Sequence, residues 1–423
     1  MLTARGLCRT VLRPFRMYIQ APLLRRRQER YVKELQKKQQ ISVVFFAMSV
    51  SMWKYQKLYE RLSKHPSFCT YIVLAPTPQF SKEIQRREVE ELRQFFDSQN
   101  IPYIDYDVDS GKCFDLRKKI NPDLLFYPQP YDTILKRPYS FYRFKDKLLC
   151  YYPYAFWMAS GETWYNSVFQ NFAWRLYYPT EEHKEEAAKW TCNKGCNVVI
   201  TGHPTTDKYL FEAPIDVWKP QTIRKKRIVW APHHTISRET TPPGTSHFLT
   251  MSSMMEEIAE RYESQLQIAF KPHPRLYYAL CEHPDWGKEK TDAYYLRWQE
   301  RPNTQLEVGD YKDLFMTSDG IIHDGGSFIV EYHYTQKPAL YVTDNLDGRL
   351  QELMRYAQEA LRAHYLAKNN EEILHFVEQV ILMEQDTMQP QRKDFFDKFL
   401  LPPNGSSVVD NTINDLLYTL RKM

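Results

Sequence analysis

The sequence predicts an α/β protein with two doubly wound, Rossmann-like domains. Three observations support this prediction: short apolar runs alternate with helical segments from residue 41 onward, a polar segment rich in proline interrupts the alternation at 214–226, and the alternation then restarts. Apolar strands separated by helices are typical of parallel sheets that helices cover on both faces. A chain of 423 residues is long enough for two such domains with separate cores.

The first domain is expected over residues 41–213. Apolar residues recur at helical spacing in the segments 55–63 and 83–98, which we expect to be helices. No Gly-x-Gly-x-x-Gly pattern follows the first strand, so the signature of a dinucleotide site is lacking and no cofactor is expected. The expected strands of this domain are 41–47, 71–75, 103–106, 124–127, 148–152 and 197–201.

The second domain is expected over residues 227–389, after a linker at 214–226. Two such domains are expected to face a cleft in which an activated donor and an acceptor can meet. A helical tail is expected at 390–423. The expected strands of this half are 227–230, 265–270, 304–308, 320–322 and 339–342, and its expected helices are 254–262, 348–363, 371–384 and 410–420.

Residues 1–40 are expected to form a basic amphipathic arm. They contain eleven Lys and Arg against two Glu, which gives the arm a net charge of +9 and the rest of the chain −4. Basic amphipathic helices are typical of segments that lie on anionic membrane surfaces. A plain charged helix is the alternative, and the acidic remainder of the chain argues against nucleic acid as a partner. The apolar residues of the arm are Leu2, Leu7, Val11, Leu12, Phe15 and Ile19.

The composition indicates the compartment. No apolar run is long enough to span a bilayer, and Arg13 and Arg16 interrupt the N-terminal apolar stretch, unlike in a secretory signal. Seven cysteines without a disulfide framework suit a reducing environment. Cys192 and Cys196 lack a second Cys/His pair, and acidic loops such as 105–109 are common, so no metal is expected. The expected location is cytoplasmic, peripheral on the inner face of the cell membrane.

A glycine turn at 325–327 is the first candidate for a binding site. The predicted strand at 320–322 leads into Gly325 and Gly326, and Ser327 stands where a helix N-cap would lie. Amides at a helix start bind anions, and glycine lets a phosphate approach the backbone. Asp324 or Glu331 could accept hydrogen bonds from ribose hydroxyls. The alternative is an ordinary strand–turn–helix connection.

A basic corner at 271–275 is the second candidate. Lys271, His273 and Arg275 follow the predicted strand 265–270 and alternate with two prolines, which end the strand. In open α/β sheets, ligands bind outside the carboxyl ends of the strands, so this corner and the glycine turn could hold a diphosphate between them. The alternative is a solvated loop.

These segments and several others resemble the CDP-glycerol glycerophosphotransferase family of teichoic-acid and capsule synthesis, which has the GT-B fold. The likeness covers roughly 200 residues, mainly in the second half, and depends on the order and spacing of the motifs. The chain departs from the family pattern in the first half, where 152–156 lacks the family's His-Gly-Thr. The matching segments are the Ala-Pro of 228–234, the His-Pro of 271–274, the Ser-Asp of 314–319 with Asp324 and Ser327, the Lys-Pro of 337–338, and 201–204 with Asp207.

The resemblance implies roles for individual residues. It favours His273 as the group that takes a proton from the acceptor hydroxyl, with His233 and His234 as alternates, because histidine titrates near neutrality. It also implies that the other residues bind the nucleotide and its phosphates. These are Lys271, Arg275, Ser318, Asp324, Gly325, Gly326, Ser327 and Glu331.

The implied activity is transfer of a phosphopolyol unit from a CDP-linked donor, such as CDP-glycerol, to a polymeric acceptor of the cell envelope. Three alternatives remain open: a GT-B glycosyltransferase that uses a UDP-sugar in capsule or lipopolysaccharide synthesis, a nucleotide-sugar epimerase, and a membrane-associated scaffold without turnover. The aromatic-rich span 127–174 could line an acceptor groove or form core.

Overall fold

The computed structural model describes residues 13–237 and 246–421, which form two compact units. Of the described residues, unit 1 comprises 13–207 and 401–421, and unit 2 comprises 208–237 and 246–400. The boundary therefore lies at Asp207, within helix α9 (Thr206–Phe211) and ahead of the segment 214–226. The segment 390–423 is divided, since its first part belongs to unit 2 and its second part to unit 1.

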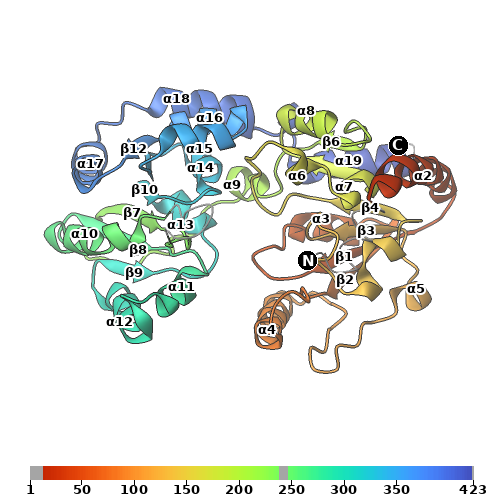
Figure 1. The fold of residues 1–423 in the computed structure, drawn as a ribbon, viewed down its shortest axis with the longest axis horizontal. Coiled ribbons are helices and arrows are strands. Elements are labelled where there is room, and N and C mark those ends of the chain that lie inside the picture. The colour runs from red at the N-terminus through yellow and green to blue at the C-terminus, as the bar shows by residue number, and fades with distance from the viewer. Residues whose placement is uncertain (1–12, 238–245, 422–423) are drawn as a thin grey trace. The chain divides into compact units, whose positions relative to one another are not determined.

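Each unit contains a parallel six-stranded sheet with helices, which confirms the predicted fold class (Figure 1). The strand order in unit 1 is β2-β1-β3-β4-β5-β6. Its strands are β1 Ile41–Ala47, β2 Phe68–Leu74, β3 Leu124–Tyr127, β4 Leu148–Tyr151, β5 Arg175–Tyr178 and β6 Val198–Ile200. Its helices include α3 Gln56–Ser63, α4 Lys82–Ser98, α5 Leu116–Lys119, α6 Glu162–Tyr165, α7 Val168–Phe172 and α8 Glu181–Trp190.

Two expectations about these strands are wrong. The segment 103–106 is not a strand: only Ile104 pairs, through an isolated bridge to Val73. Pro102 precedes the segment and cannot donate to a ladder, which limits the pairing. Strand β5 was not expected because it begins with a charged residue, Arg175, whose guanidinium pairs with Asp415 at 3.0 Å.

The aromatic-rich span 127–174 forms part of the core of unit 1, together with aromatic residues of the neighbouring strands. Phe45 of β1 stacks on Phe126 of β3, with 4.8 Å between the ring centroids. Tyr177 of β5 lies beside Phe126 at 6.5 Å. Because most of the large rings in the span are buried, their main use is packing. The buried aromatic residues of the span are Tyr127, Tyr139, Phe141, Phe144, Tyr151, Tyr152, Phe156, Trp157, Tyr165, Phe169, Phe172 and Trp174.

The described part of the basic arm packs against unit 1. A π-helical turn, η1 (Phe15–Gln20), continues into α2 (Ala21–Leu35), and one face of the pair is buried. The opposite face exposes large apolar side chains. Four of the residues predicted for the apolar face, Leu2, Leu7, Val11 and Leu12, lie outside the described residues. The buried face consists of Met17, Ala21, Leu24, Gln28, Val32 and Leu35.

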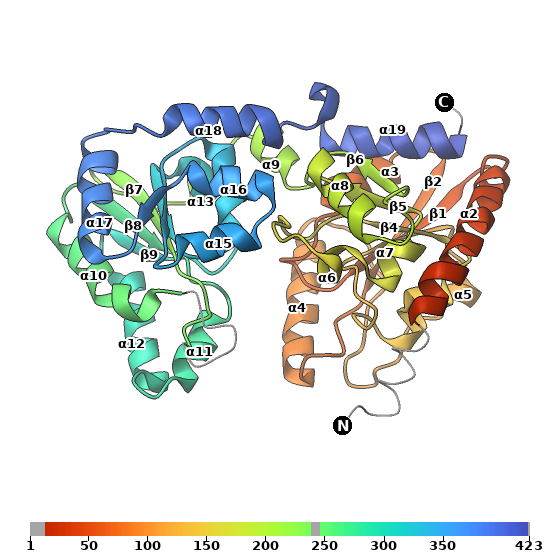
Figure 2. The same ribbon diagram turned by 45° about the horizontal axis from the view of Figure 1, so that its top comes forward.

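The C-terminal helix α19 (Val408–Arg421) completes unit 1 beside α2 (Figure 2). Gln36, at the end of α2, donates to the carbonyl of Thr419 at 2.9 Å. At the start of α19, the Asp207 carboxylate accepts from the amides of Val408 and Val409 at 2.8 and 3.0 Å. This contact satisfies two of the free N–H groups of a helix start. The predicted helix 410–420 is therefore confirmed, and it packs on the first unit rather than forming a free tail.

The sheet of unit 2 has the order β12-β11-β10-β7-β8-β9. Because β8 and β9 lie on one side of β7 while β10 to β12 lie on the other, the order reverses between β7 and β10. That position is the topological switch point, where ligands of doubly wound folds bind. The strands are β7 Lys226–Ala231, β8 Leu266–Phe270, β9 Thr304–Leu306, β10 Gly320–His323, β11 Ala339–Val342 and β12 Tyr365–Ala367.

Helices flank this sheet, and the largest rings pack between them. Trp230 of β7 stacks on Phe270 of β8 at 4.8 Å and on Phe248 of α10 at 5.7 Å. Strand β12 was not expected, and the predicted helix 348–363 is two helices, α15 and α16. The helices are α10 Phe248–Arg261, α11 Leu276–Glu282, α12 Gly287–Glu300, α13 Lys312–Thr317, α14 Phe328–Glu331, α15 Leu346–Glu352, α16 Arg355–Arg362, α17 Asn370–His375 and α18 Gln389–Phe395.

The described helices include none with the length and hydropathy that a bilayer span needs.

Candidate functional site

Three loops meet at the carboxyl edge of the unit 2 sheet. The loop after β7 carries His233 and His234, the loop after β8 carries 271–275, and the loop after β10 carries the glycine turn 325–327. These strands are neighbours in the order β10-β7-β8, so the two predicted corners flank the histidine pair at the switch point. Backbone bonds join two of the loops, because the amides of Lys271 and His273 donate to the carbonyls of Trp230 and Pro232 at 2.8 and 3.0 Å.

Asp324 fixes the loops to one another. Its Oδ1 accepts from the amide of His233 at 2.6 Å, and its Oδ2 accepts from the amide of His247 at 2.6 Å and from Ser246 Oγ at 3.0 Å. The carboxyl group is fully buried, which raises its pKa, while the three donors act in the opposite direction. Both oxygens are thus engaged within the protein, and the predicted contact with a ribose hydroxyl would have to replace one of these bonds.

The glycine turn offers open backbone. A Cβ built on Gly325 would meet only His233 Cδ2, at an ordinary 3.7 Å, and the residue does not adopt a left-handed conformation. The protein itself therefore does not require glycine at this position. Ser327 precedes α14, as predicted, but its side chain makes no capping bond and is exposed. Helix α14 has only four residues before it tightens into a 3₁₀ turn at Tyr332–Thr335.

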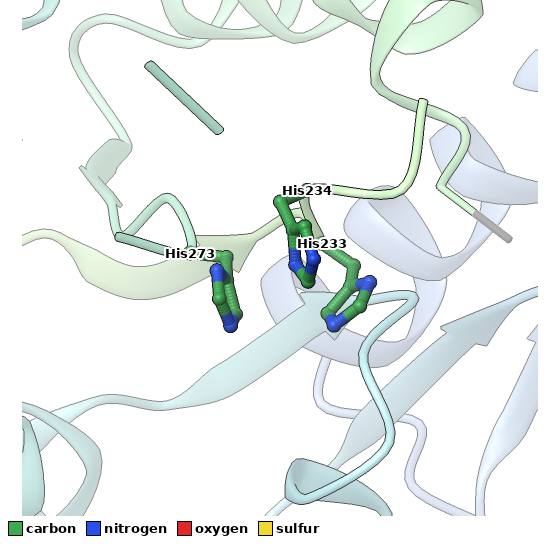
Figure 3. Close-up of side chains that lie close together, drawn as sticks. All are labelled: His233, His234 and His273. Atoms are coloured by element: carbon green, nitrogen blue, oxygen red, sulfur yellow. The ribbon is translucent and has the colours of Figure 1, made fainter. Parts of the chain in front are cut away.

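The three candidate histidines lie side by side (Figure 3). The ring centroids of His234 and His273 are 4.1 Å apart, those of His233 and His234 are 4.2 Å apart, and those of His233 and His273 are 4.9 Å apart. One ring nitrogen of each residue lies within 4.8 Å of the others. The geometry thus brings together all three residues that the resemblance named for proton transfer.

Hydrogen bonds decide where the protons of these rings sit. The amide of Arg275 donates to His273 Nδ1 at 3.1 Å, so the neutral His273 ring carries its proton on Nε2. The same His-Pro turn recurs at His65, His203 and His283, where the amide two residues on donates to Nδ1 at 3.2 Å. His233 Nδ1 pairs with Thr235 Oγ1 at 2.9 Å, while His234 Nδ1 is buried with no hydrogen-bond partner in the described structure.

All three rings are neutral near pH 7. Burial lowers the pKa of His273 to about 3, with further lowering by His234, His233, Arg275 and Lys271. Burial and then His234 and Arg349 lower the pKa of His233 to about 4. The pKa of His234 is lowered by burial and by Arg275. The cations around the rings thus create a positive potential, which suits an anionic ligand.

Two of these cations were predicted. The side chain of Lys271 is buried and its pKa is lowered by burial, with Glu307 and Asp310 acting in the opposite direction. Its Nζ lies 5.6 Å from the centroid of the Tyr311 ring. Arg275, at the start of α11, is exposed to solvent. A buried lysine and an exposed arginine on one short loop can neutralise a phosphate group that binds beside them.

Arg349 of α15 was not predicted. Its Nε donates to Tyr341 Oη at 3.0 Å, and its other end pairs with Glu352 at 3.0 Å. Its charge reaches His233, whose pKa it lowers. No sequence signal could have found it, because a single arginine in a surface helix is common and its contact with Tyr341 of β11 depends on the fold.

Glu331 is buried beside the site rather than open to it. Tyr209 Oη donates to its Oε1 at 3.1 Å and Tyr311 Oη to its Oε2 at 2.9 Å. The hydroxyls come from two other segments: Tyr209 belongs to helix α9, 122 residues away, and Tyr311 to the loop before α13, 20 residues away. A ribose contact of Glu331 would therefore have to exchange with one of these tyrosines.

Ser318 does not lie with the other predicted residues. It precedes β10, whereas the glycine turn follows that strand, so the two lie at opposite edges of the parallel sheet. Its buried Oγ donates to the carbonyl of Phe315 at 2.8 Å and pairs with Tyr332 Oη at 2.7 Å. Lys337 Nζ, from the matching Lys-Pro segment, donates to the carbonyl of Met316 at 2.7 Å and also contacts that of Ser318. These two motifs stabilise the amino edge of the sheet, and Ser318 does not lie with the other residues that were expected to bind phosphate.

Comparison with solved structures shows the fold. A variant of the wall teichoic acid polymerase TagF superposes with a TM-score of 0.58 over 99% of this chain and 97% of that chain, at 14% identity. The UDP-GlcNAc 2-epimerase of Methanocaldococcus jannaschii, solved with UDP-GlcNAc and UDP, superposes with a TM-score of 0.55 over 90% of this chain and 99% of that one, at 16% identity. The two doubly wound units are therefore those of the GT-B class. No curated protein sequence matches the chain.

The sequence itself matches a family. Residues 171–409, more than half of the chain, match the family described as CDP-glycerol:poly(glycerophosphate) glycerophosphotransferase. The match includes the three loops at the switch point of unit 2 and also the last strands of unit 1. The chain therefore belongs to the CDP-glycerol:poly(glycerophosphate) glycerophosphotransferase family and is a transferase.

Proposed function

We propose that the protein transfers a phosphopolyol unit, phosphoglycerol in the first instance, from a CDP-linked donor to a polymeric acceptor of the cell envelope. The family match over residues 171–409 is the observation that carries this proposal. The site supports it, because a diphosphate requires cations and open backbone amides, and both lie at the switch point of unit 2.

The donor diphosphate is proposed to lie between the glycine turn and the basic corner. The amides of 325–327 and Ser327 Oγ bind phosphate oxygens, while Lys271 and Arg275 neutralise their charge. The open space at Gly325 supports this placement, since no neighbouring atom of the protein excludes a side chain there. Glycine at 325 is then explained by the close approach of the ligand.

The reaction requires in-line displacement at the phosphorus next to the polyol. The acceptor oxygen forms a bond to that phosphorus, the bond to the bridging oxygen breaks, and CMP leaves with the electron pair. His273, whose proton is on Nε2, is proposed to donate a hydrogen bond to a phosphate oxygen. The acceptor proton then passes to His233 or His234, whose rings adjoin it. His273 thus acts as a hydrogen-bond donor in this proposal, and not as the base that the resemblance implied.

A donor panel tests the proposal. The purified protein is incubated with CDP-glycerol, other CDP-polyols and UDP-sugars, with and without an oligomeric polyol-phosphate acceptor, and the release of CMP, UMP and UDP is measured. CMP release that depends on the acceptor is the expected result. Nucleotide binding without any release, over the whole panel, would support a scaffold and contradict the proposal.

Sugar transfer or epimerisation is the second candidate. The likeness of 90% of the chain to a UDP-GlcNAc 2-epimerase favours it, because that structure was solved with UDP-GlcNAc and UDP. In the same panel, UDP release with an acceptor would indicate glycosyl transfer. Epimerisation would convert a UDP-sugar to its epimer without an acceptor, which the sugar product reveals.

We also propose that the exposed face of η1 and α2 lies on an anionic membrane, which places the protein on the inner face of the cell membrane. This face presents large apolar side chains of Phe15, Tyr18, Ile19 and Leu23, which are 46, 70, 51 and 52% exposed. The exposed Arg26 and Arg27 follow directly. Apolar residues flanked by arginines suit the boundary between lipid headgroups and acyl chains.

Substitution is a better test than deletion of the arm, because Leu24 and Leu35 on the opposite face belong to the packed interior. The double variant Tyr18→Ser, Leu23→Ser is compared with wild type in sedimentation with vesicles that contain phosphatidylglycerol. The expected result is release from the vesicles with unchanged thermal stability. Equal sedimentation of the two proteins would show that this face is not the anchor.

A further inference from the structure

We propose that His233, His234 and His273 form a binding site for one zinc-type divalent ion, with an anion as the fourth ligand. Three imidazoles and one exchangeable position make up the ligand set of many catalytic zinc sites. Borderline-soft ions such as Zn²⁺ and Co²⁺ prefer imidazole, whereas Mg²⁺ prefers oxygen. The chemistry of the three side chains therefore selects the class of ion.

The three rings lie near enough to one another to coordinate a single ion. Their ligand atoms all lie within 4.8 Å of one another. Nitrogens around a tetrahedral zinc lie about 3.3 Å apart, given a metal–nitrogen bond of about 2.0 Å. Side-chain rotations that move each ligand nitrogen by roughly an ångström would bring the three nitrogens to this spacing. The backbone that carries the rings is held by Asp324 and by the bond from His273 N–H to the Pro232 carbonyl at 3.0 Å, so the rings stay together.

Two of the three rings can offer a lone pair without moving a proton from one ring nitrogen to the other. When His233 Nδ1–H donates to Thr235 Oγ1, at 2.9 Å, the lone pair is on Nε2. His234 Nδ1 is buried and makes no hydrogen bond within the described residues, so it can either bind the ion or hold the proton while Nε2 binds. His273 differs, since binding through Nε2 requires the proton to move to Nδ1 and the contact with the Arg275 amide, at 3.1 Å, to open.

The surrounding charge determines the fourth ligand. Lys271, Arg275 and Arg349 all lie close enough to affect the rings, so a bare dication meets repulsion. An anion bound to the ion offsets that repulsion. The glycine turn begins beside His233, with only 3.7 Å between His233 Cδ2 and a Cβ built on Gly325. The part of the inference that names a phosphate oxygen as the fourth ligand depends on the proposed function, whereas the three-histidine site does not.

The same nitrogens serve the ion and the proposed proton transfer. The ion-loaded protein is therefore expected to be inactive as a phosphotransferase, and zinc is expected to inhibit turnover. Such a site would make the reaction sensitive to the free concentration of transition ions. Inhibition alone is weak support, so the test measures binding itself.

Cobalt substitution provides that measurement. The full-length protein, treated with a chelator and then freed of it, is titrated with Co²⁺, and the visible absorption of the bound ion is recorded. Tetrahedral Co²⁺ absorbs strongly between roughly 500 and 650 nm, whereas the hexaaqua ion absorbs weakly, so the geometry that three imidazoles and one anion impose is visible directly. The variants are His233→Gln, His234→Gln and His273→Gln. His283→Gln is the matched control, because His283 lies in the same unit and has the same His-Pro turn, with Asp285 N–H at 3.2 Å from Nδ1.

The expected result is one equivalent of tetrahedral cobalt in the wild type and in His283→Gln, displaced by zinc, and loss of the band in each of the other variants. Addition of CMP should shift the band and tighten binding. Absence of the band in a folded wild type, or its persistence in His234→Gln, would overturn the site. If CMP leaves the band unchanged, only the assignment of a phosphate oxygen as the fourth ligand is overturned. Nucleotide release in the donor panel is independent of these outcomes, so the two proposals fail separately.

Discussion

At the scale of single residues, the protonation of the histidines follows from short-range contacts. A His-Pro turn directs the amide of residue 275 at Nδ1 of His273, which leaves a donor at Nε2. Burial, with further lowering by the neighbouring histidines and cations, then keeps the ring neutral, with a pKa of about 3. A neutral donor next to a phosphate supplies a hydrogen bond without taking a proton, as transition-state stabilisation requires.

The first prediction concerns His273. The variant His273→Ala should lower kcat/KM by about 10- to 100-fold, since a hydrogen bond to a charged group contributes about 1.5–3 kcal/mol. His273→Gln should recover part of this loss, because the glutamine amide replaces the Nε2–H donor. His283→Gln is the control for general effects on stability, as its turn has the same backbone contact. Equal activity of the alanine variant and wild type would remove His273 from the site.

His273 could be picked from the sequence because the His-Pro dipeptide and its spacing from 325–327 are visible there. The engagement of Asp324 by Ser246 and His247 could not be predicted, since the bonding partners are nearly 80 residues away in the chain. The same holds for Glu331, which two tyrosines from different segments bind. Long-range partners of a buried carboxylate depend on the fold and have no local signature.

At the scale of elements, α19 shows how a terminal helix becomes part of a domain. Its buried residues, Leu416 and Leu420 among them, join the core of unit 1, and its first turn is capped by Asp207. Gly202 makes this approach possible: it has a φ of +95°, and a Cβ there would lie 2.8 Å from Val408 Cγ2. The Gly-x-Pro-x-x-Asp likeness of 201–207 is thus explained by packing and capping.

The second prediction tests this cap. Asp207→Ala should lower the free energy of unfolding of unit 1 by about 2 kcal/mol, because two charge-assisted bonds to the start of α19 are lost. Urea denaturation followed by circular dichroism measures the change. Asp410→Ala, in the first turn of the same helix and 41% exposed at its side chain, should cost less. A cost for Asp410→Ala equal to that for Asp207→Ala would contradict the capping role.

The strands show where sequence patterns succeed and fail. Apolar runs such as 41–47 and 339–342 coincide with β1 and β11 because each is buried on both faces of its sheet. Strand β12 was missed because it has three residues and an exposed Leu366 in the middle. The segment 103–106 has strand-like residues but gains only one bridge, so composition alone does not decide pairing.

At the scale of the whole molecule, buried neutral histidines occur in both units. His183 in unit 1 and His364 in unit 2 are fully buried, and burial lowers the pKa of each to about 4. Burial also lowers the pKa values of His323 and His333 far below the usual range of histidine. In the unfolded chain, all of them titrate near pH 6.5. Between about pH 4 and pH 6.5, the unfolded state therefore binds more protons than the folded state.

The third prediction follows from that difference. Stability from His183 and His364 is fully present above about pH 6.5 and is lost as the pH falls toward 4, because the folded pKa lies below the unfolded one. The loss between pH 7.5 and 4.5 should be about 2–3 kcal/mol for His364, given its folded pKa of about 4. Denaturation at the two pH values should show a smaller difference in the free energy of unfolding for His364→Phe than for wild type. An equal difference in both proteins would contradict the prediction.

The two-unit fold was predictable as a class because alternation of strands and helices is a property of the sequence. The family match and the likeness to GT-B structures agree with that class. The division of the segment 390–423 between the units was not predictable, since a terminal helix shows an apolar face but not the domain it covers.

The central claim is that unit 2 binds a diphosphate at 325–327, and Gly325→Ala tests it most directly. The added methyl group meets only His233 Cδ2 at 3.7 Å, so the variant should fold and melt as the wild type does. Gly309→Ala, where nothing lies within 4 Å of the new methyl group, is the control. Calorimetric titration with CDP should show binding to wild type and Gly309→Ala and its loss in Gly325→Ala. Binding of CDP to Gly325→Ala with unchanged affinity would contradict the account.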